Sequence, residues 1–130
     1  MNKNCLNKLP DSGERQEFKT GAVRETASGK GSPSLISPEL IFRLSKHLEL
    51  GAKKYAPRNW ESGFPFSRVM DSLLRHVFQY IAGDNAEDHL AAITCNVMFL
   101  MHFEKYHPEL QDFPLRLEKI TEEIQEKSNA

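Results

Sequence analysis

The chain has 130 residues, 39% of them hydrophobic and 27% charged, a mixture typical of one soluble globular domain. Two cysteines argue against a disulfide-stapled secreted scaffold, and no apolar run marks a signal peptide or a membrane span. The net charge of −1 gives no support to duplex nucleic acid as a partner. We therefore expect a cytoplasmic protein that binds neither membranes nor duplex DNA.

The charges are unevenly distributed along the chain. Residues 1–60 hold 11 Lys and Arg against 6 Asp and Glu, whereas residues 61–130 hold 6 against 12. This division favours phosphate-binding groups in the first half and metal-binding groups in the second. The alternative is that the two halves only attract each other, within one chain or across a dimer.

The first part of the chain shows no helical pattern. Residues 1–20 are poor in large apolar side chains and predict a mobile tail. Residues 21–36 predict a loop that begins a single domain of residues 21–130. Arg24 and Lys30, which lie among glycines in this loop, are candidates for a flexible lid over phosphates.

Four helices are predicted after this loop. Apolar residues at helical spacing indicate helices over about 38–51, 67–82, 86–105 and 114–127, and the segments between them contain helix-breaking glycine or proline. β-strand alternation is absent, so we expect an all-α fold, a small bundle of about four helices. So small a bundle leaves its core incompletely covered, which favours a homo-oligomer.

Each of the two central helices has an expected core face. On the second helix it comprises Met70, Leu73, Leu74, Val77, Phe78 and Ile81, and on the third helix Leu90, Ile93, Val97, Leu100 and Met101. The third helix also has a candidate start signal. Asp84, three residues before Glu87, has the spacing of a capping box.

The start of the third helix carries several groups capable of chemistry. Asp88, His89 and Asn96 lie along one stripe with small alanines between them, which leaves room for a ligand or a metal. The alternative for Glu87 is a purely structural role as a reciprocal helix cap, because acidic residues are common in a first helical turn.

The second helix offers Asp71, Arg75 and His76. A tight turn should make the second and third helices antiparallel neighbours, so that these residues face Glu87 and the residues after it. Facing carboxylates suit Mg²⁺, whereas two or three histidines with an acid suit a transition metal. The alternative is an ordinary Asp71–Arg75 surface pair with a half-buried core histidine.

The exit of the first helix is the densest basic region of the chain. Lys53, Lys54 and Arg58 are interleaved with Tyr55 and Trp60. Basic side chains can bind a triphosphate, and an aromatic face can stack on a base. The alternatives are a solvated positive patch and, for Trp60, a role as a core anchor.

Taken together, these residues resemble a known family. The relevant strings are Gly21-Ala22-Val23-Arg24, Gly29-Lys30, Gly51-Ala52-Lys53-Lys54-Tyr55, Arg58-Asn59-Trp60, Arg75-His76, Glu87-Asp88-His89-Leu90 and Asn96. Over about residues 21–105 they are similar to the phage-associated dATP/dGTP diphosphohydrolase N-terminal domain family, and more distantly to the all-α MazG-like nucleotide pyrophosphatases. The resemblance implies Mg²⁺-dependent hydrolysis of a purine deoxynucleoside triphosphate to the monophosphate and pyrophosphate.

The leading interpretation is a metal-dependent nucleoside triphosphate pyrophosphohydrolase acting on dATP or dGTP, in a bacterial host if a phage encodes it. The predicted residues are Glu49, Asp71, Glu87 and Asp88 for Mg²⁺ or Mn²⁺; Asp88, His89 and His76 for catalysis; and Arg24, Lys30, Lys53, Lys54, Tyr55, Arg58, Asn59, Trp60, Arg75 and Asn96 for substrate. One alternative is a non-catalytic nucleotide-binding module, since the paired acids of MazG-like enzymes are missing. The other is a small phage interaction protein.

Overall fold

The computed structural model describes residues 9–130, and the first eight residues of the expected tail lie outside this range. The chain divides into two compact units, Met1–Ile36 and Ser37–Ala130. In the first unit, β1 (Arg15–Glu17) pairs with β2 (Val23–Glu25) as an antiparallel hairpin, with Gln16 opposite Arg24. A short 3₁₀ turn, η2 (Pro33–Leu35), follows.

The hairpin is a departure from the strand-free segment that the sequence predicts. Its turn is closed by two backbone hydrogen bonds, from Phe18 N–H to the Ala22 carbonyl and from Gly21 N–H to the Phe18 carbonyl. Gly21 has φ of 89°, a conformation that glycine adopts without steric cost. Strands of three residues are too short to show the alternation by which strands are recognised in a sequence.

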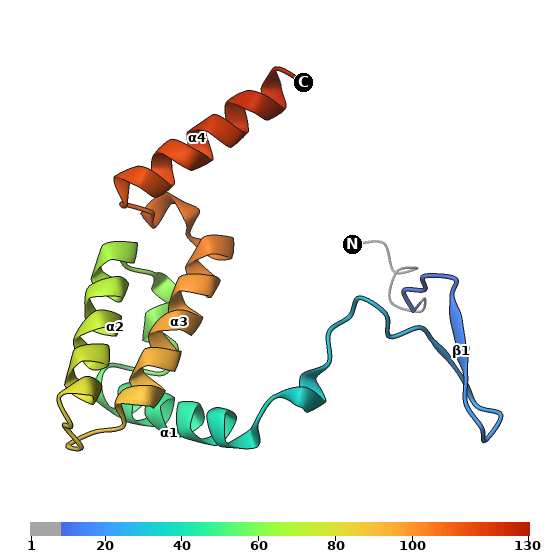
Figure 1. Ribbon diagram of the computed structural model, residues 1–130, viewed down its shortest axis with the longest axis horizontal. Coiled ribbons are helices and arrows are strands. Elements are labelled where there is room, and N and C mark those ends of the chain that lie inside the picture. Colours follow the sequence, from blue (N-terminus) through green and yellow to red (C-terminus); the bar gives the residue numbers. More distant parts are fainter. Residues whose placement is uncertain (1–8) are drawn as a thin grey trace. The chain divides into compact units, whose positions relative to one another are not determined.

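The second unit confirms the mostly helical fold (Figure 1). Its helices are α1 (Pro38–Lys54), α2 (Phe66–Ile81), α3 (His89–Tyr106) and α4 (Pro114–Ser128), joined by the 3₁₀ turns η3 (Asn59–Ser62) and η4 (Pro108–Leu110). Helix α3 packs against both α1 and α2, and it runs antiparallel to α2. None of the helices in the described part of the chain has the length and apolar character that a bilayer crossing requires.

The core lies between α2 and α3. Phe66 and Val69 of α2 meet Phe103 of α3, whose side chain is fully buried. Partly buried apolar residues surround them: Trp60, Phe64, Phe99, Leu100, Leu110 and Phe113. Several of these contacts are between aromatic rings, among them an edge-to-face pair of Phe64 and Phe103 with centroids 5.2 Å apart.

The buried face of α3 differs from the expected one. Ala91, Ala92 and Cys95 are buried, whereas Val97 and Met101 are 36% and 67% exposed. These small side chains are buried together with the larger Phe103 of the same helix. Of the large apolar residues that the sequence analysis singled out on this helix, Leu100 packs against the core, whereas Leu90, Val97 and Met101 are exposed.

Candidate functional site

The turn between α2 and α3 is shaped by two aspartates. Asp88, and not Asp84, is the N-cap of α3, because its Oδ1 accepts a hydrogen bond of 3.1 Å from the Ala91 N–H. Asp84 instead accepts from the Ala86 N–H at 3.1 Å. The predicted capping box is therefore wrong, and α3 begins at His89 rather than near residue 86. As a result Glu87 lies outside the helix, in the turn.

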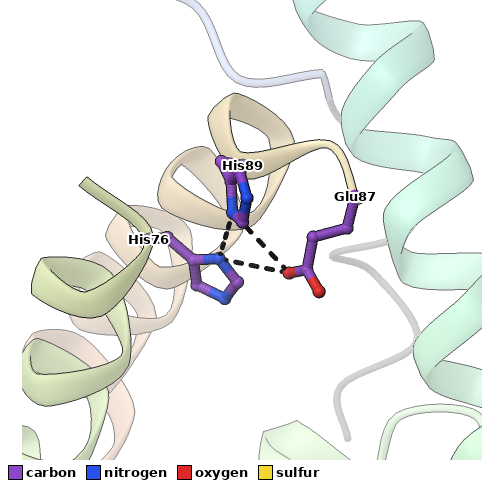
Figure 2. Close-up of side chains that lie close together, drawn as sticks. All are labelled: His76, Glu87 and His89. Carbon is purple, nitrogen blue, oxygen red and sulfur yellow. Dashed lines mark hydrogen bonds and ion pairs between the residues drawn. The ribbon is translucent and has the colours of Figure 1, made fainter. Parts of the chain in front are cut away.

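Three side chains meet where this turn passes the end of α2 (Figure 2). His76 Nδ1 lies 2.9 Å from His89 Nδ1 and 3.2 Å from Glu87 Oε1, and His89 Nδ1 lies 3.8 Å from the same Glu87 oxygen. The His89 side chain is 1% exposed, that of His76 19% and that of Glu87 56%. Two ring nitrogens and one carboxylate oxygen thus face one small volume that is open to solvent on the Glu87 side. These three residues, called the His/Glu/His cluster below, can hold a metal ion.

A fourth residue fixes the orientation of the buried histidine. Asp84 Oδ2 lies 2.8 Å from His89 Nε2. Because a carboxylate only accepts hydrogen bonds, Nε2 carries the proton in this tautomer and Nδ1 presents its lone pair to the cluster. The Ala86 N–H and the His89 ring hold the pKa of Asp84 below its ordinary value, so Asp84 is ionised at neutral pH.

The protonation of His76 also suits metal binding. Burial lowers the pKa of His76 below its ordinary value of 6.5, and the Glu87 carboxylate opposes this shift. His76 is therefore mainly the neutral imidazole at pH 7. A neutral imidazole has a lone pair to donate, whereas an imidazolium has none.

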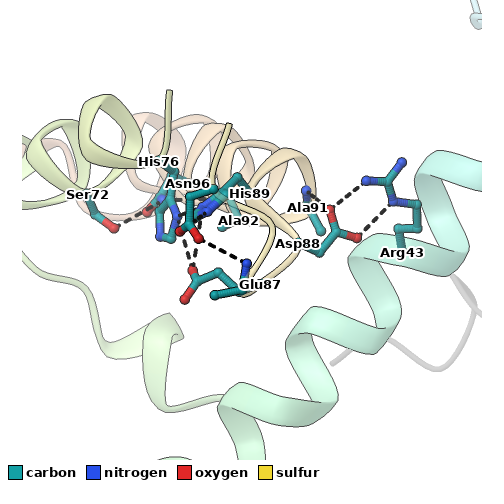
Figure 3. Close-up of polar contacts among 11 residues, drawn as sticks. Arg43, Ser72, His76, Glu87, Asp88, His89, Ala91, Ala92 and Asn96 are labelled. Atoms are coloured by element: carbon teal, nitrogen blue, oxygen red, sulfur yellow. Dashed lines mark hydrogen bonds and ion pairs between the residues drawn. The ribbon is translucent and has the colours of Figure 1, made fainter. Parts of the chain in front are cut away.

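Asp88 is not part of the cluster and instead pairs with Arg43 (Figure 3). Both of its carboxylate oxygens accept from Arg43 of α1, with Nε–Oδ2 at 2.8 Å and Nη2–Oδ1 at 2.6 Å. The Arg43 guanidinium, together with the Ala91 N–H, lowers the pKa of Asp88 to about 2. The charge and geometry of Asp88 thus link α1 to the start of α3.

A pocket of about 420 Å³ adjoins the cluster. Its lining comprises Arg43, Tyr80, Asp84, Asn85, Glu87, Asp88, His89 and Leu90. Arg43, Tyr80 and Asn85 were not singled out in the sequence, because an isolated arginine, tyrosine or asparagine carries no spacing signal. Asp84 was considered only as a cap. The turn, the end of α2 and α1 together bring these residues into one pocket.

Of the residues predicted from the sequence, His76, Glu87 and His89 meet in the cluster, and Asp88 lies beside it. Asn96 is buried about two turns farther along α3 than His89, and its Nδ2 donates to the Ala92 carbonyl at 3.0 Å and to Ser72 Oγ at 3.3 Å. The other predicted metal ligands, Glu49 and Asp71, are exposed on α1 and α2 and are not part of the cluster. Arg75 is likewise exposed on α2.

The basic and aromatic residues at the end of α1 and in the segment after it are not part of the pocket lining. Lys53 pairs with Glu49 at 3.6 Å, and Lys54 Nζ lies 5.2 Å from the Tyr55 ring centroid. Arg58 pairs with Glu61, and Asn59 begins η3. Trp60 stacks on Phe99 with centroids 5.0 Å apart, beside the core.

The two remaining predicted residues belong to the first unit. Arg24 lies in β2 and Lys30 Nζ is 3.1 Å from Glu25 Oε2. Both side chains therefore belong to the hairpin unit and its following loop.

Comparison with known proteins adds a family relationship. Residues 20–113 match a family model described as "dATP/dGTP diphosphohydrolase, N-terminal". A protein of Salmonella phage PMBT28, described as a dATP/dGTP diphosphohydrolase, is 28% identical over 89 residues, which make up 65% of this chain and 30% of the phage protein. The chain thus matches less than a third of that relative's length. No solved structure matches the chain.

Proposed function

Because this chain belongs to the dATP/dGTP diphosphohydrolase N-terminal family, we propose that it is a divalent-metal-dependent hydrolase of dATP and dGTP. Its products are the deoxynucleoside monophosphate and pyrophosphate. In this reaction a water oxygen bonds to the α-phosphorus, the bond from that phosphorus to the α,β-bridging oxygen breaks, and the water proton passes to solvent. The observation that supports the proposal best is that Glu87 and His89 belong both to the His/Glu/His cluster and to the pocket wall.

His76, Glu87 and His89 would hold the metal ion. The ion would supply positive charge beside the phosphates and would acidify water in its neighbourhood. The donor set fits this task, because three protein ligands leave coordination positions open on the solvent side. Asp88 contributes by holding Arg43 at the pocket wall.

The pocket offers groups for the remainder of a nucleotide. Arg43 uses Nε and one hydrogen of Nη2 for Asp88, so Nη1 and the second Nη2 hydrogen stay available to phosphate oxygens. Tyr80 is 55% exposed at the pocket wall, where its ring can stack on a base. The Asn85 amide, which both donates and accepts, can hydrogen-bond the edge of the base.

A product assay tests this function. Purified protein is incubated with each of the eight common nucleoside triphosphates and with Mg²⁺, Mn²⁺ or chelator, and the products are separated. We expect metal-dependent release of pyrophosphate from dATP and dGTP. Release of phosphate alone, or equal turnover of all eight nucleotides, contradicts the proposal.

Variants connect turnover to the cluster. His76→Gln and Glu87→Gln should each reduce kcat at least tenfold, because each removes one ligand atom. His102→Gln is the matched control, since His102 packs against Trp60 and Tyr106 and is not part of the cluster. Equal activity in the three variants excludes the cluster as the reaction site.

A non-catalytic nucleotide-binding module is the second candidate. It is favoured by the observation that the chain matches 30% of its phage relative, a share compatible with one part of a larger enzyme. A rise in melting temperature with dATP or dGTP, without turnover under either metal, identifies this function instead.

A further inference from the structure

We propose that the His/Glu/His cluster is a site for a first-row transition-metal ion rather than for Mg²⁺, and that Asp84 is the positioning residue that orients its buried ligand, His89. The inference rests on the proposed function only in placing the ion beside a nucleotide pocket. Its evidence comes from four side chains, His76, Asp84, Glu87 and His89.

The spacing of the ligand atoms fits a single ion. With metal–ligand bonds of about 2.1 Å, neighbouring ligand atoms are about 3.0 Å apart around an octahedral ion and about 3.4 Å apart around a tetrahedral one. The three observed separations are 2.9, 3.2 and 3.8 Å. An ion can therefore contact all three atoms after small side-chain rotations.

The facing ring nitrogens of His76 and His89 lie close enough to share a proton or to bind the same metal ion. Two imidazole lone pairs 2.9 Å apart repel each other unless a proton or a metal ion lies between them. A metal ion also uses the third group, because Glu87 Oε1 lies within 3.8 Å of both nitrogens. Without a metal, an N–H on His76 Nδ1 can donate to His89 Nδ1 or to Glu87 Oε1, and a bound ion would take the place of that proton.

The chemistry of the donors selects the class of ion. Mg²⁺ prefers oxygen ligands, keeps several waters and binds proteins through one or two carboxylates. Imidazole nitrogen suits iron, nickel, copper and zinc ions, and two histidines with one carboxylate form a known binding face for Fe²⁺. The cluster offers one carboxylate and two imidazoles, so it favours the transition metals.

Asp84 completes the arrangement from outside the cluster. Histidine ligands commonly donate their second ring N–H to a carboxylate, which fixes the ring and makes the ligand nitrogen more basic. His89 does so to Asp84 at 2.8 Å, and Asp84 is itself held by the Ala86 N–H. Since the His89 side chain is 1% exposed, its ring is also held by packing.

Cobalt binding in the absence of nucleotide tests the inference. The 130-residue protein is freed of metal by chelator and titrated with Co²⁺, and the visible absorption of the bound ion gives stoichiometry and affinity. We expect one Co²⁺ per chain, displacement by equimolar Zn²⁺ and retention of Co²⁺ in millimolar Mg²⁺. Displacement by millimolar Mg²⁺, or the absence of any Co²⁺ spectrum, overturns the inference.

Variants separate ligands from the positioning residue. Glu87→Gln, at an exposed position, should weaken Co²⁺ binding strongly without unfolding the protein. Asp84→Asn should weaken it about 10–100-fold and shift the absorption band, as expected for a lost carboxylate partner of a histidine ligand. Asp71→Asn, which changes an exposed aspartate on α2, is the control and should bind Co²⁺ like the wild type. Wild-type affinity in either Glu87→Gln or Asp84→Asn refutes the assigned role.

Failure of this inference is distinguishable from failure of the proposed function. Co²⁺ binding without nucleotide turnover leaves the metal site in place and contradicts the hydrolase. Hydrolysis of dATP with Mg²⁺ by a protein that binds no Co²⁺ supports the hydrolase and contradicts the transition-metal site.

Discussion

Arg43 in the first turns of α1 binds both carboxylate oxygens of Asp88, 45 residues later in the chain and directly before α3. Asp88 also caps α3 through the Ala91 N–H. One carboxylate therefore sets where α3 begins and where α1 lies against it. Because His89 is the first residue of α3, the same carboxylate also determines where this ligand enters the His/Glu/His cluster.

The two roles of Asp88 can be separated by substitution. Asp88→Asn keeps a side-chain acceptor for the Ala91 N–H and loses the charge that pairs with Arg43, whereas Asp88→Ala loses both. Asparagine and aspartate are comparable N-caps, and loss of a cap costs about 1 kcal/mol. We expect the free energy of unfolding in urea to be about 1 kcal/mol lower for Asp88→Ala than for Asp88→Asn. Equal stability of the two variants would show that the cap contributes nothing.

Stability should depend on acid pH through the same pair. Asp88 has a pKa of about 2 in the folded chain, against an ordinary value of 3.8, so between these pH values the unfolded chain binds more protons. The Asp88 contribution is therefore present above pH 4 and is lost as the pH falls towards 2. In Arg43→Gln the main cause of the shift is gone. We expect the difference in melting temperature between wild type and Arg43→Gln to shrink from pH 5 to pH 2, and a constant difference contradicts the assignment.

Gly63, between η3 and α2, should not tolerate a side chain. It has φ of 86°, and an added Cβ would lie 2.6 Å from Leu110 Cδ1 and 3.0 Å from the His107 ring. His107 cannot easily move, because its Nε2 lies 2.6 Å from the Glu61 carbonyl. Gly63→Ala should lower the free energy of unfolding by about 1–3 kcal/mol.

Gly51→Ala is the matched control for that substitution. Gly51 lies within α1, and an added Cβ would meet no atom within 4 Å. Alanine is favoured over glycine in a helix interior by about 0.5–1 kcal/mol, so this variant should be more stable than the wild type. If both alanines change stability equally, the contact of Gly63 with η4 is not a packing constraint.

The Cys95 thiol should be unreactive in the folded protein. Burial in α3 raises the pKa of Cys95 to about 11, and only the thiolate attacks thiol reagents. In a Cys5→Ser background, a disulfide reagent at pH 8 should label Cys95 slowly in native buffer and rapidly in denaturant. Rapid labelling in native buffer would show that α2 and α3 separate readily.

Much of the fold is visible in the sequence. Helical spacing of apolar residues, with glycine and proline between the segments, predicts four helices close to those found, and the all-helical class is confirmed apart from one small hairpin. The family relationship is confirmed as well. The faces of the helices are less predictable. On α3 two alanines and a cysteine are buried beside Phe103 while Val97 and Met101 are exposed, and helical spacing alone does not show which apolar side chains face the neighbouring helices.

The sequence alone determined the residue types of the site: histidines and acids on both sides of one tight turn, in a chain of ordinary composition. Only the tertiary structure decided which of them meet. By spacing alone, several acidic residues of the turn could be the N-cap of α3. Asp88 takes this position while it also binds Arg43 of α1, which is 45 residues earlier in the sequence. Because Asp88 is the N-cap, Glu87 lies in the turn before α3, and Asp84 accepts a hydrogen bond from His89 Nε2. A cluster with ligand atoms within 4 Å depends on such long-range contacts, which local sequence spacing does not encode.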